Sequence, residues 1–427
     1  MLLEPNEAHE ASDDAPTIAS VGKRSFWGSL VTRTLPNYTG PHAVGVADIE
    51  VPVRTPKTFG SFEHVKIPGK PVGLALETVL FTLFYPAVPS PGDSEQSIWF
   101  PNAVCGELAS RGYIVAAVEH RDGTGPSSSI RTPDGDFKVL PFLNWKDIHW
   151  PDLQEQPKDD TILRHSQLDL RLAEMEITLK VMEMINSGQD IENMSILSPH
   201  WDWISWVGST DANKAKVMGH SLGGTAAIKA AADPRFSFTH CIALDPAVQR
   251  IEPWTSTIDI PLLTINSEEF AVGMDGGDFT RLLGVFETAP QENSYIFNLP
   301  GGSHPSFSDI HLILPGFINK RMGLRGTPEC VLELVVKTSV AFLNGKADDV
   351  KRRAEKTEGA QIRPIGVPGR IQYYDRREGT ETGGSTVDLG GMLREGPTDS
   401  TAELGRLFRE GDSVELESVE VEMGEAQ

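Results

Sequence analysis

A Gly-x-Ser-x-Gly pattern at Gly219-His-Ser-Leu-Gly223 is the part of this chain with the most obvious chemistry. An apolar segment over 215–220 precedes it and predicts a strand, and an Ala-rich segment over 225–232 predicts a helix. A sharp strand-to-helix turn holds a serine in a strained conformation with its hydroxyl exposed. The alternative is that Ser221 is an ordinary N-cap residue in a Gly-rich turn, without a catalytic role. The order strand, turn, helix favours Ser221 as a nucleophile.

A nucleophilic serine needs a histidine that takes its proton and a carboxylate that orients the histidine. Asp245 lies at the end of a predicted strand over 240–245, and Pro246 stops that strand. The alternative role is that of an Asp at a turn. Functional groups collect at the carboxyl ends of parallel strands, so we favour Asp245 as the orienting acid.

Two histidines follow Asp245 in the sequence, His304 and His311. His304 lies in the Gly-rich loop over 300–305, directly after the predicted strand over 295–299. His311 lies in a segment that looks like a packed helix or strand. A loop at a strand end suits an exposed imidazole, so we favour His304 as the base.

Other candidates are weaker. His120 ends a predicted strand, and it either lines the site or braces the loop. Gly219 and Gly223 are further candidates for lining the site, and they let strand and helix pass closely. His220 is expected to point away from substrate into a hydrogen bond. No metal-ligand spacing occurs among the Cys and His residues, so we expect no metal and no cofactor.

The predicted strands alternate with helices, which favours a mostly parallel sheet flanked by helices. The helices are expected over 162–187, with another ending near 107–111. The strands are expected over 79–85, 113–118, 215–220, 240–245, 261–266 and 295–299.

The chain has 427 residues with a net charge of −22 and 39% hydrophobic residues. We expect a disordered segment over 1–30, one α/β domain over 31–345 and an acidic, mostly disordered tail over 346–427. The negative charge argues against a nucleic acid partner. Three cysteines give no disulfide framework, and no signal peptide or membrane span is seen, so a cytoplasmic location is expected. The sequence does not indicate an oligomeric state.

Several motifs together resemble the platelet-activating-factor acetylhydrolase family of the plasma and intracellular type II kind, in its fungal branch. They are Leu35-Pro-Asn-Tyr-Thr-Gly-Pro-His-Ala-Val-Gly45, Tyr113-Ile-Val-Ala-Ala-Val-Glu-His-Arg-Asp122, Gln167-Leu-Asp-Leu-Arg171, Gly219-His-Ser-Leu-Gly-Gly224, Ile242-Ala-Leu-Asp245 and Ile265-Asn-Ser-Glu268. The resemblance implies an α/β-hydrolase fold and metal-independent hydrolysis of short or oxidised sn-2 acyl chains of phospholipids. It assigns Ser221 as nucleophile, Asp245 as acid, His304 as base and the Leu222 N–H as an oxyanion donor.

One departure from this family concerns the stretch between Tyr85-Pro86 and Gly106-Glu-Leu-Ala109. Family members carry a strand there that ends in a His-Gly pair, and this chain has neither. The lost strand is central in the sheet and supplies the second oxyanion donor. Either the sequence comes from a mis-spliced transcript or incomplete gene model, which we favour, or another segment fills the gap.

The leading hypothesis is therefore a serine esterase that acts on platelet-activating-factor-like phospholipids at a lipid–water interface. A catalytically impaired hydrolase scaffold is one alternative, motivated by the missing segment. Another lipase or esterase of the α/β-hydrolase class is the second alternative.

Overall fold

The computed structural model describes residues 1–3, 35–64, 73–87, 103–131, 136–197, 203–272, 277–357 and 372–374. All of them belong to one unit, Met1–Gly379. Most of the segment over 1–30 and most of the tail over 346–427 therefore lie outside the described residues. The stretch over 88–102 also lies outside the described residues. It makes up most of the interval in which family members carry the His-Gly pair.

A six-stranded sheet carries the segments predicted to hold the nucleophile, the acid and the base. Its strand order is β13-β14-β12-β11-β10-β9, and β9 to β12 run parallel. Parallel neighbours bring the carboxyl ends of these strands to the same edge. The strands are β9 (Val217–His220), β10 (Cys241–Leu244), β11 (Leu262–Ser267), β12 (Tyr295–Leu299), β13 (Glu355–Thr357) and β14 (Gln372–Tyr374).

A second sheet has four strands in the order β1-β5-β4-β2, and all of its pairs are antiparallel. Its strands are β1 (Leu2–Leu3), β2 (Ala43–Phe59), β4 (Leu74–Ala87) and β5 (Ile114–Glu119). Two small antiparallel pairs accompany it, β3 (Glu63–His64) with β8 (Ile148–His149) and the hairpin of β6 (Ser127–Arg131) with β7 (Phe137–Pro141).

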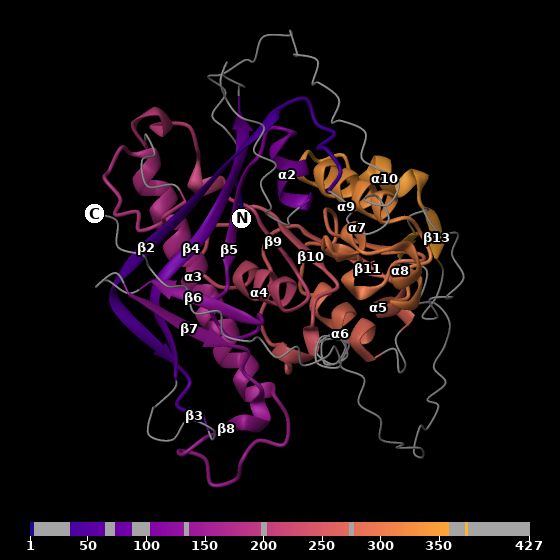
Figure 1. The fold of residues 1–427 in the computed structure, drawn as a ribbon. Coiled ribbons are helices and arrows are strands. Elements are labelled where there is room, and N and C mark those ends of the chain that lie inside the picture. The colour runs from indigo at the N-terminus through magenta and orange to yellow at the C-terminus, as the bar shows by residue number, and fades with distance from the viewer. Residues whose placement is uncertain are drawn as a thin grey trace, which may run out of the picture. The chain divides into compact units, whose positions relative to one another are not determined.

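Helices cover both faces of the parallel strands (Figure 1). One face packs on α3, α4 and α6, and the other packs on α2 and α9. This explains why β10 and β11 are buried along their whole length. The α-helices are α2 (Ala103–Ala109), α3 (Thr161–Asn186), α4 (Leu222–Ala231), α5 (Glu268–Val272), α6 (Gly277–Phe286), α7 (Ile310–Ile313), α8 (Gly316–Arg321), α9 (Pro328–Leu343) and α10 (Ala347–Arg353), and the 3₁₀ turns are Trp145–Asp147, Trp203–Trp206, Ala212–Lys214, Val248–Ile251 and His304–Phe307.

The strand β1 lies in the position between β5 and β9 that the sequence leaves without a strand. Leu2 pairs with Val115 of β5 and also bridges to Lys216, which immediately precedes β9. The backbones of Leu2 and Lys216 exchange two hydrogen bonds, of 2.9 and 2.8 Å. Another segment thus lies in the gap, the second of the two arrangements considered above.

The side chains of β1 are buried on both faces of the sheet. Leu3 packs in the cluster that contains α3, and Leu2 packs in the cluster that contains α9. Their exposed fractions are 0% and 1%. The expectation of disorder over 1–30 is therefore wrong for these first three residues, because their apolar side chains complete both layers of the core.

The predicted elements correspond closely to the observed ones. The helix over 162–187 is α3, and the strand over 295–299 is β12. The parallel arrangement holds for β9 to β12, whereas β2, β4 and β5 are antiparallel. The structured part also extends past residue 345, since Ala347 of α10 is buried against α9.

Candidate active site

Ser221 occupies the turn between β9 and α4, as the sequence predicts. Its backbone has φ +55° and ψ −124°, a conformation that residues with a Cβ rarely adopt. The surrounding structure holds this strain: the Ser221 N–H donates to the carbonyl of Leu244 at 2.9 Å, and the Ser221 carbonyl accepts from the Thr225 N–H at 3.0 Å. Strain that is fixed by its surroundings is typical of functional positions.

The glycines around Ser221 have different physical roles. A Cβ on Gly219 would lie 2.1 Å from the carbonyl oxygen of Gly223, so the strand and helix could not approach as they do. A Cβ on Gly224 would lie 3.1 Å from the Gly219 oxygen. Among the described residues, a Cβ on Gly223 would, in contrast, meet only the Arg171 Nη1 atom, at 3.9 Å. Gly219 and Gly224 are thus needed for packing, while Gly223 borders open space.

Asp245 follows β10 and is completely buried. Its backbone is also strained, with φ +41°. The Ser267 N–H donates to Asp245 Oδ1 at 2.6 Å, and the Ser267 hydroxyl donates to Oδ2 at 2.5 Å. Burial raises the pKa of Asp245, while the hydrogen bonds from His304 and Ser267 act in the opposite direction.

His304 lies between Ser221 and Asp245. Its Nε2 atom is 3.0 Å from Ser221 Oγ, and its Nδ1 atom is 3.2 Å from Asp245 Oδ2. The His304 side chain is 24% exposed, so it is not fully enclosed by the surrounding residues. These distances allow a proton to pass from the serine to an imidazole whose other nitrogen is held by a carboxylate.

Two glutamates of α5 hold the loop that carries His304. The Gly301 N–H donates to Glu268 Oε2 at 2.7 Å, and the His304 N–H donates to Glu269 Oε2 at 2.8 Å. Arg325 also pairs with Glu268 Oε2, the oxygen that accepts the Gly301 N–H. Sequence reasoning gave these glutamates no role, although Glu268 belongs to a motif quoted for the resemblance. The sequence signal for these two roles was the position of both glutamates directly after β11, at the same edge of the sheet as Asp245.

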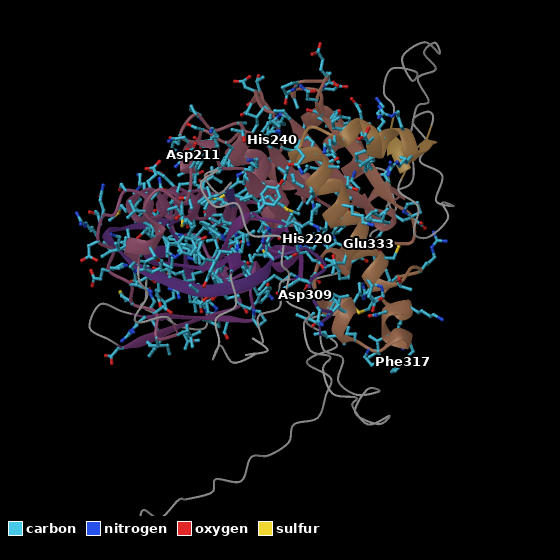
Figure 2. The ribbon with its side chains drawn as sticks, turned by 90° about the horizontal axis from the view of Figure 1, so that it is seen from above. Asp211, His220, His240, Asp309, Phe317 and Glu333 are labelled. Carbon is cyan, nitrogen blue, oxygen red and sulfur yellow. The ribbon has the colours of Figure 1, made fainter. Side chains whose placement is uncertain are left out.

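His220 forms the expected hydrogen bond, which joins it to the His304 backbone, but its ring packs on His304 and does not turn away from the site. The centroids of the two rings lie 4.7 Å apart, and Figure 2 shows His220 in the middle of the side-chain view, in contrast to Phe317 at its rim. Burial lowers the pKa of His220 to about 3, and the charge of His304 adds to this effect. Among the described residues, no group forms a hydrogen bond with the His220 Nε2 atom. His220 therefore presents a neutral ring to His304.

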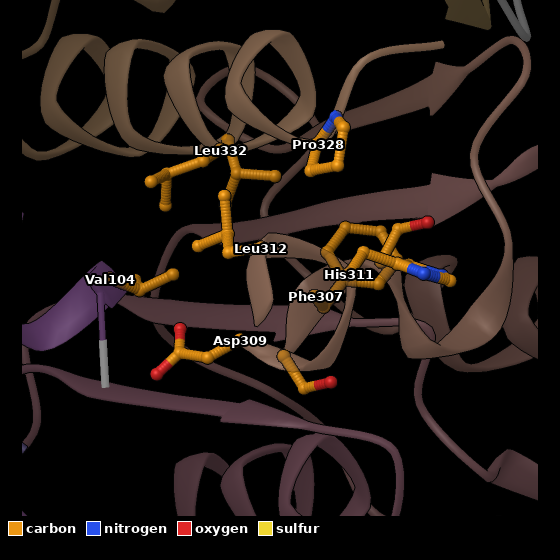
Figure 3. A pocket seen from close by; sticks show the side chains of 10 residues that line it. Val104, Phe307, Asp309, His311, Leu312, Pro328 and Leu332 are labelled. Carbon is orange, nitrogen blue, oxygen red and sulfur yellow. The ribbon is translucent and has the colours of Figure 1, made fainter. Parts of the chain in front are cut away.

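His311 has a structural role, which supports the choice of His304 from the sequence. It lies on α7, is 1% exposed, and its Nδ1 atom is 2.8 Å from Asn319 Oδ1. Its Nε2 atom is 3.0 Å from the Ser303 hydroxyl. Figure 3 shows it beside Phe307, and both residues line a pocket of about 10 Å³, which has room for no more than a water.

Among the described residues, no hydrogen bond joins His120 to Ser221, His304 or Asp245. Its Nδ1 atom lies 2.6 Å from Glu174 Oε2 of α3, and Glu174 also accepts the Arg121 N–H at 3.0 Å. Of the two roles considered from the sequence, the brace has support, because His120 joins the end of β5 to α3. The cavity that His120 lines is not lined by Ser221, His304 or Asp245.

The backbone donors near Ser221 come from the start of α4. Leu222 is the first residue of this helix, so its N–H is among the donors that a helix leaves without an intrahelical acceptor. On the other side of Ser221, β1 reaches only to the level of Ala116, whose N–H donates to the Met1 carbonyl at 2.9 Å. In the part of the chain that the structure describes, no strand lies beyond Met1 toward the site.

The residues that the structure describes also lack two kinds of feature. No group of three or more His, Cys, Asp or Glu side chains there is arranged to hold a metal ion. No helix there is both long and apolar enough to cross a membrane.

Known proteins similar to this chain share much of it. A platelet-activating factor acetylhydrolase from Gallus gallus is 29% identical over 265 residues, which are 60% of this chain and 60% of the relative. One from Cavia porcellus is 31% identical over 240 residues, 56% of this chain and 52% of the relative. A putative phospholipase A2 from Schizosaccharomyces pombe is 24% identical over 282 residues, 57% of this chain and 63% of the relative. The matches thus span about half to three fifths of these relatives.

The family model described as platelet-activating factor acetylhydrolase, isoform II, matches residues 102–362, more than half of the chain. This range begins just before α2 and contains Ser221, Asp245 and His304. With its parallel strands, its flanking helices and this match, the chain is an α/β-hydrolase that belongs to the platelet-activating factor acetylhydrolase isoform II family.

Proposed function

We propose that this chain is a serine esterase that hydrolyses the sn-2 acetyl, or another short or oxidised acyl ester, of platelet-activating-factor-like phospholipids. One observation carries the proposal: His304 lies within 3.2 Å of both Ser221 Oγ and Asp245 Oδ2, at the turn of a Gly-x-Ser-x-Gly motif. Membership of the family and the names of the similar proteins supply the substrate class.

In the proposed reaction, the Ser221 hydroxyl attacks the ester carbonyl while His304 Nε2 takes its proton. Asp245 holds the Nδ1–H tautomer of His304 and stabilises the imidazolium that forms. The Leu222 N–H stabilises the oxyanion. The tetrahedral intermediate then releases the lysophospholipid, which receives the proton from His304. Water, activated by the same imidazole, hydrolyses the acyl-enzyme and releases acetate.

The test uses two substrates, p-nitrophenyl acetate and a 1-alkyl-2-acetyl phosphocholine lipid in vesicles. Substituting Ser221→Ala should lower kcat for both by at least about 10⁴-fold, because the nucleophile is lost. A fluorophosphonate probe should label the unsubstituted protein and not the variant. An unchanged rate in the variant would contradict the proposal. A series of acyl lengths separates it from a general lipase, since the proposal requires a steep fall beyond short chains.

A second candidate function rests on β1. This strand lies where a strand with the second oxyanion donor is expected, and one lost donor costs about 10²- to 10³-fold in rate. A catalytically impaired scaffold is therefore the alternative. Folded protein that never reacts with the fluorophosphonate probe would favour the scaffold over the esterase.

A further inference from the structure

His220 is the last residue of β9, directly before Ser221, and it contacts the turn that carries the proposed base. The centroid of its ring lies 4.7 Å from that of His304 and 5.5 Å from that of Phe307. His304 and Phe307 are the first and last residues of the same 3₁₀ turn. The neighbour of the proposed nucleophile therefore contacts both ends of the turn from which the proposed base projects.

A hydrogen bond joins the His220 ring to the His304 backbone, and this bond raises the pKa of His220. A hydrogen bond with this effect is donated by the ring to a carbonyl, because it stabilises the protonated imidazole. The Nε2 atom of His220 is buried and has no partner among the described residues, so the donor is Nδ1. The His304 N–H donates to Glu269 at 2.8 Å. Side chains from β9 and α5 thus hold the carbonyl and the N–H of His304.

The contact between the two rings acts on the part of His304 that the backbone does not fix. An imidazole turns about two side-chain bonds, and both nitrogens of His304 have partners: Nε2 is 3.0 Å from Ser221 Oγ, and Nδ1 is 3.2 Å from Asp245 Oδ2. A misplacement of about 1 Å can lower a rate by about 10²-fold. The His220 ring, tilted by 43° to that of His304, lies at the distance of a favourable aromatic contact. It therefore restricts the rotation of the imidazole.

The His220 ring also carries no charge that would oppose the chemistry of His304. Burial lowers the pKa of His220 to about 3, so the ring is neutral at pH 7. In the proposed reaction His304 becomes an imidazolium, and a second positive charge at this distance would disfavour that state. Histidine thus supplies at this position both a neutral flat ring and an N–H donor, whereas phenylalanine would supply only the ring.

We propose that His220 is a positioning residue: its ring holds the His304 imidazole in line with Ser221 and Asp245, and its N–H holds the carbonyl of His304. The inference rests on the proposed function and adds a residue to the same site. His220 acts on the ester through His304. Because His220 and Ser221 are adjacent in β9 and the following turn, the same short segment sets the positions of the nucleophile and of the base.

Two substitutions separate the ring of His220 from its N–H. His220→Ala removes both, and kcat for p-nitrophenyl acetate should fall about 10²-fold with KM unchanged. His220→Phe keeps a flat ring and should recover most of this loss, leaving a fall of about fivefold for the missing hydrogen bond. Equal losses of kcat in the two variants, or a change in KM alone, would overturn the proposal.

His240→Ala is the matched control for His220→Ala. His240 is also a partly buried histidine of the same sheet, and its ring packs on Phe342 with the centroids 5.3 Å apart. It directly precedes β10, at the end of the parallel strands opposite to Ser221. We expect kcat to be unchanged in His240→Ala. A fall as large as that in His220→Ala would show that truncation of a packed histidine lowers the rate without any effect on positioning.

Proton NMR reports the position of His304 without turnover. The Nδ1–H that bonds to Asp245 should give a downfield resonance in the unsubstituted protein, and its loss in His304→Gln would assign it. His220→Ala should broaden or remove this resonance, whereas His220→Phe and His240→Ala should retain it. An unchanged resonance in His220→Ala, or its absence from the unsubstituted protein, would contradict the positioning role.

The two measurements also separate this inference from the esterase itself. Failure of the unsubstituted protein to hydrolyse p-nitrophenyl acetate or the acetyl lipid would contradict the proposed function alone. The resonance would still show whether His220 holds His304, because it is measured without an ester.

Discussion

The two sides of the nucleophile strand β9 are built differently. On one side, β10 to β12 continue the sheet with parallel strands in unbroken register, and these strands carry Asp245 and the His304 loop. On the other side, the only described strand between β9 and β5 is β1, two residues long and antiparallel. The first side fixes the geometry of the proposed chemistry. The side that contains β1 joins the two sheets, and we expect it to contribute mainly to stability.

The comparison predicts that activity and stability can be separated. We expect Asp245→Asn to lower kcat for p-nitrophenyl acetate by about 10⁴-fold, because His304 would take the wrong tautomer.

Burial raises the pKa of Asp245, so the folded state binds its proton more tightly than the unfolded state. The unfolding free energy therefore falls as pH rises through the folded-state pKa, and the Asn variant should lack this fall.

Urea unfolding of both proteins at several pH values, from about 4 upward, measures this difference. Equal pH dependence in the two proteins would show that Asp245 is not the buried acid described here. Retention of activity by Asp245→Asn would remove the acid from the proposed mechanism.

The largest stability effect is expected at β1. Leu3 and Leu263 of β11 are both 0% exposed, and each packs in the core. If β1 is a true member of the sheet, Leu3→Ala should lower the unfolding free energy by about 2–5 kcal/mol, in the same range as Leu263→Ala. Urea unfolding at one pH compares them. A loss below about 1 kcal/mol for Leu3→Ala alone would mean that β1 is only loosely held.

The control for this comparison is Ile204→Ala. Ile204 is 81% exposed, so the same kind of truncation there should change the unfolding free energy by less than about 0.5 kcal/mol.

The smallest effect on activity is expected at Ser267, which touches Asp245 and no reacting group. Ser267→Ala removes the hydroxyl that donates to Asp245 Oδ2 and keeps the N–H that donates to Oδ1. We expect kcat to fall about tenfold with KM unchanged, since one hydrogen bond to a charged group contributes about 1.5–3 kcal/mol. The acid limb of the kcat pH profile should also move upward. Ser267→Thr, which restores a hydroxyl, should recover most of the rate.

The parallel side was predictable from sequence because each of its strands is an apolar run that ends at a chemically distinctive residue. The segments over 240–245 and 295–299 are such runs, and they place Asp245 and His304 within reach of Ser221. The contacts of Ser267 and Glu269 could not be predicted, since they depend on the register between β11 and its neighbours.

The role of β1 could not be predicted either. Three apolar residues show no period, and isolated from the rest of the fold they have no preference for a strand. Their pairing follows from the unoccupied edges of β5 and β9, which exist only in the assembled sheet. The β6–β7 hairpin was missed because β6 has a single apolar residue, Ile130, so its sequence shows no alternation of apolar and polar residues.

The position of β1 has a consequence for how this protein folds. The hydrogen bond between Met1 and Ala116 closes a loop whose ends are 115 residues apart in sequence, and the bridge to Lys216 closes a longer one. Contacts of such high sequence separation form slowly, because the entropy of loop closure must be overcome first. Residues 1–3 are translated before either partner, so during synthesis they must wait for most of the sheet to emerge before they can dock.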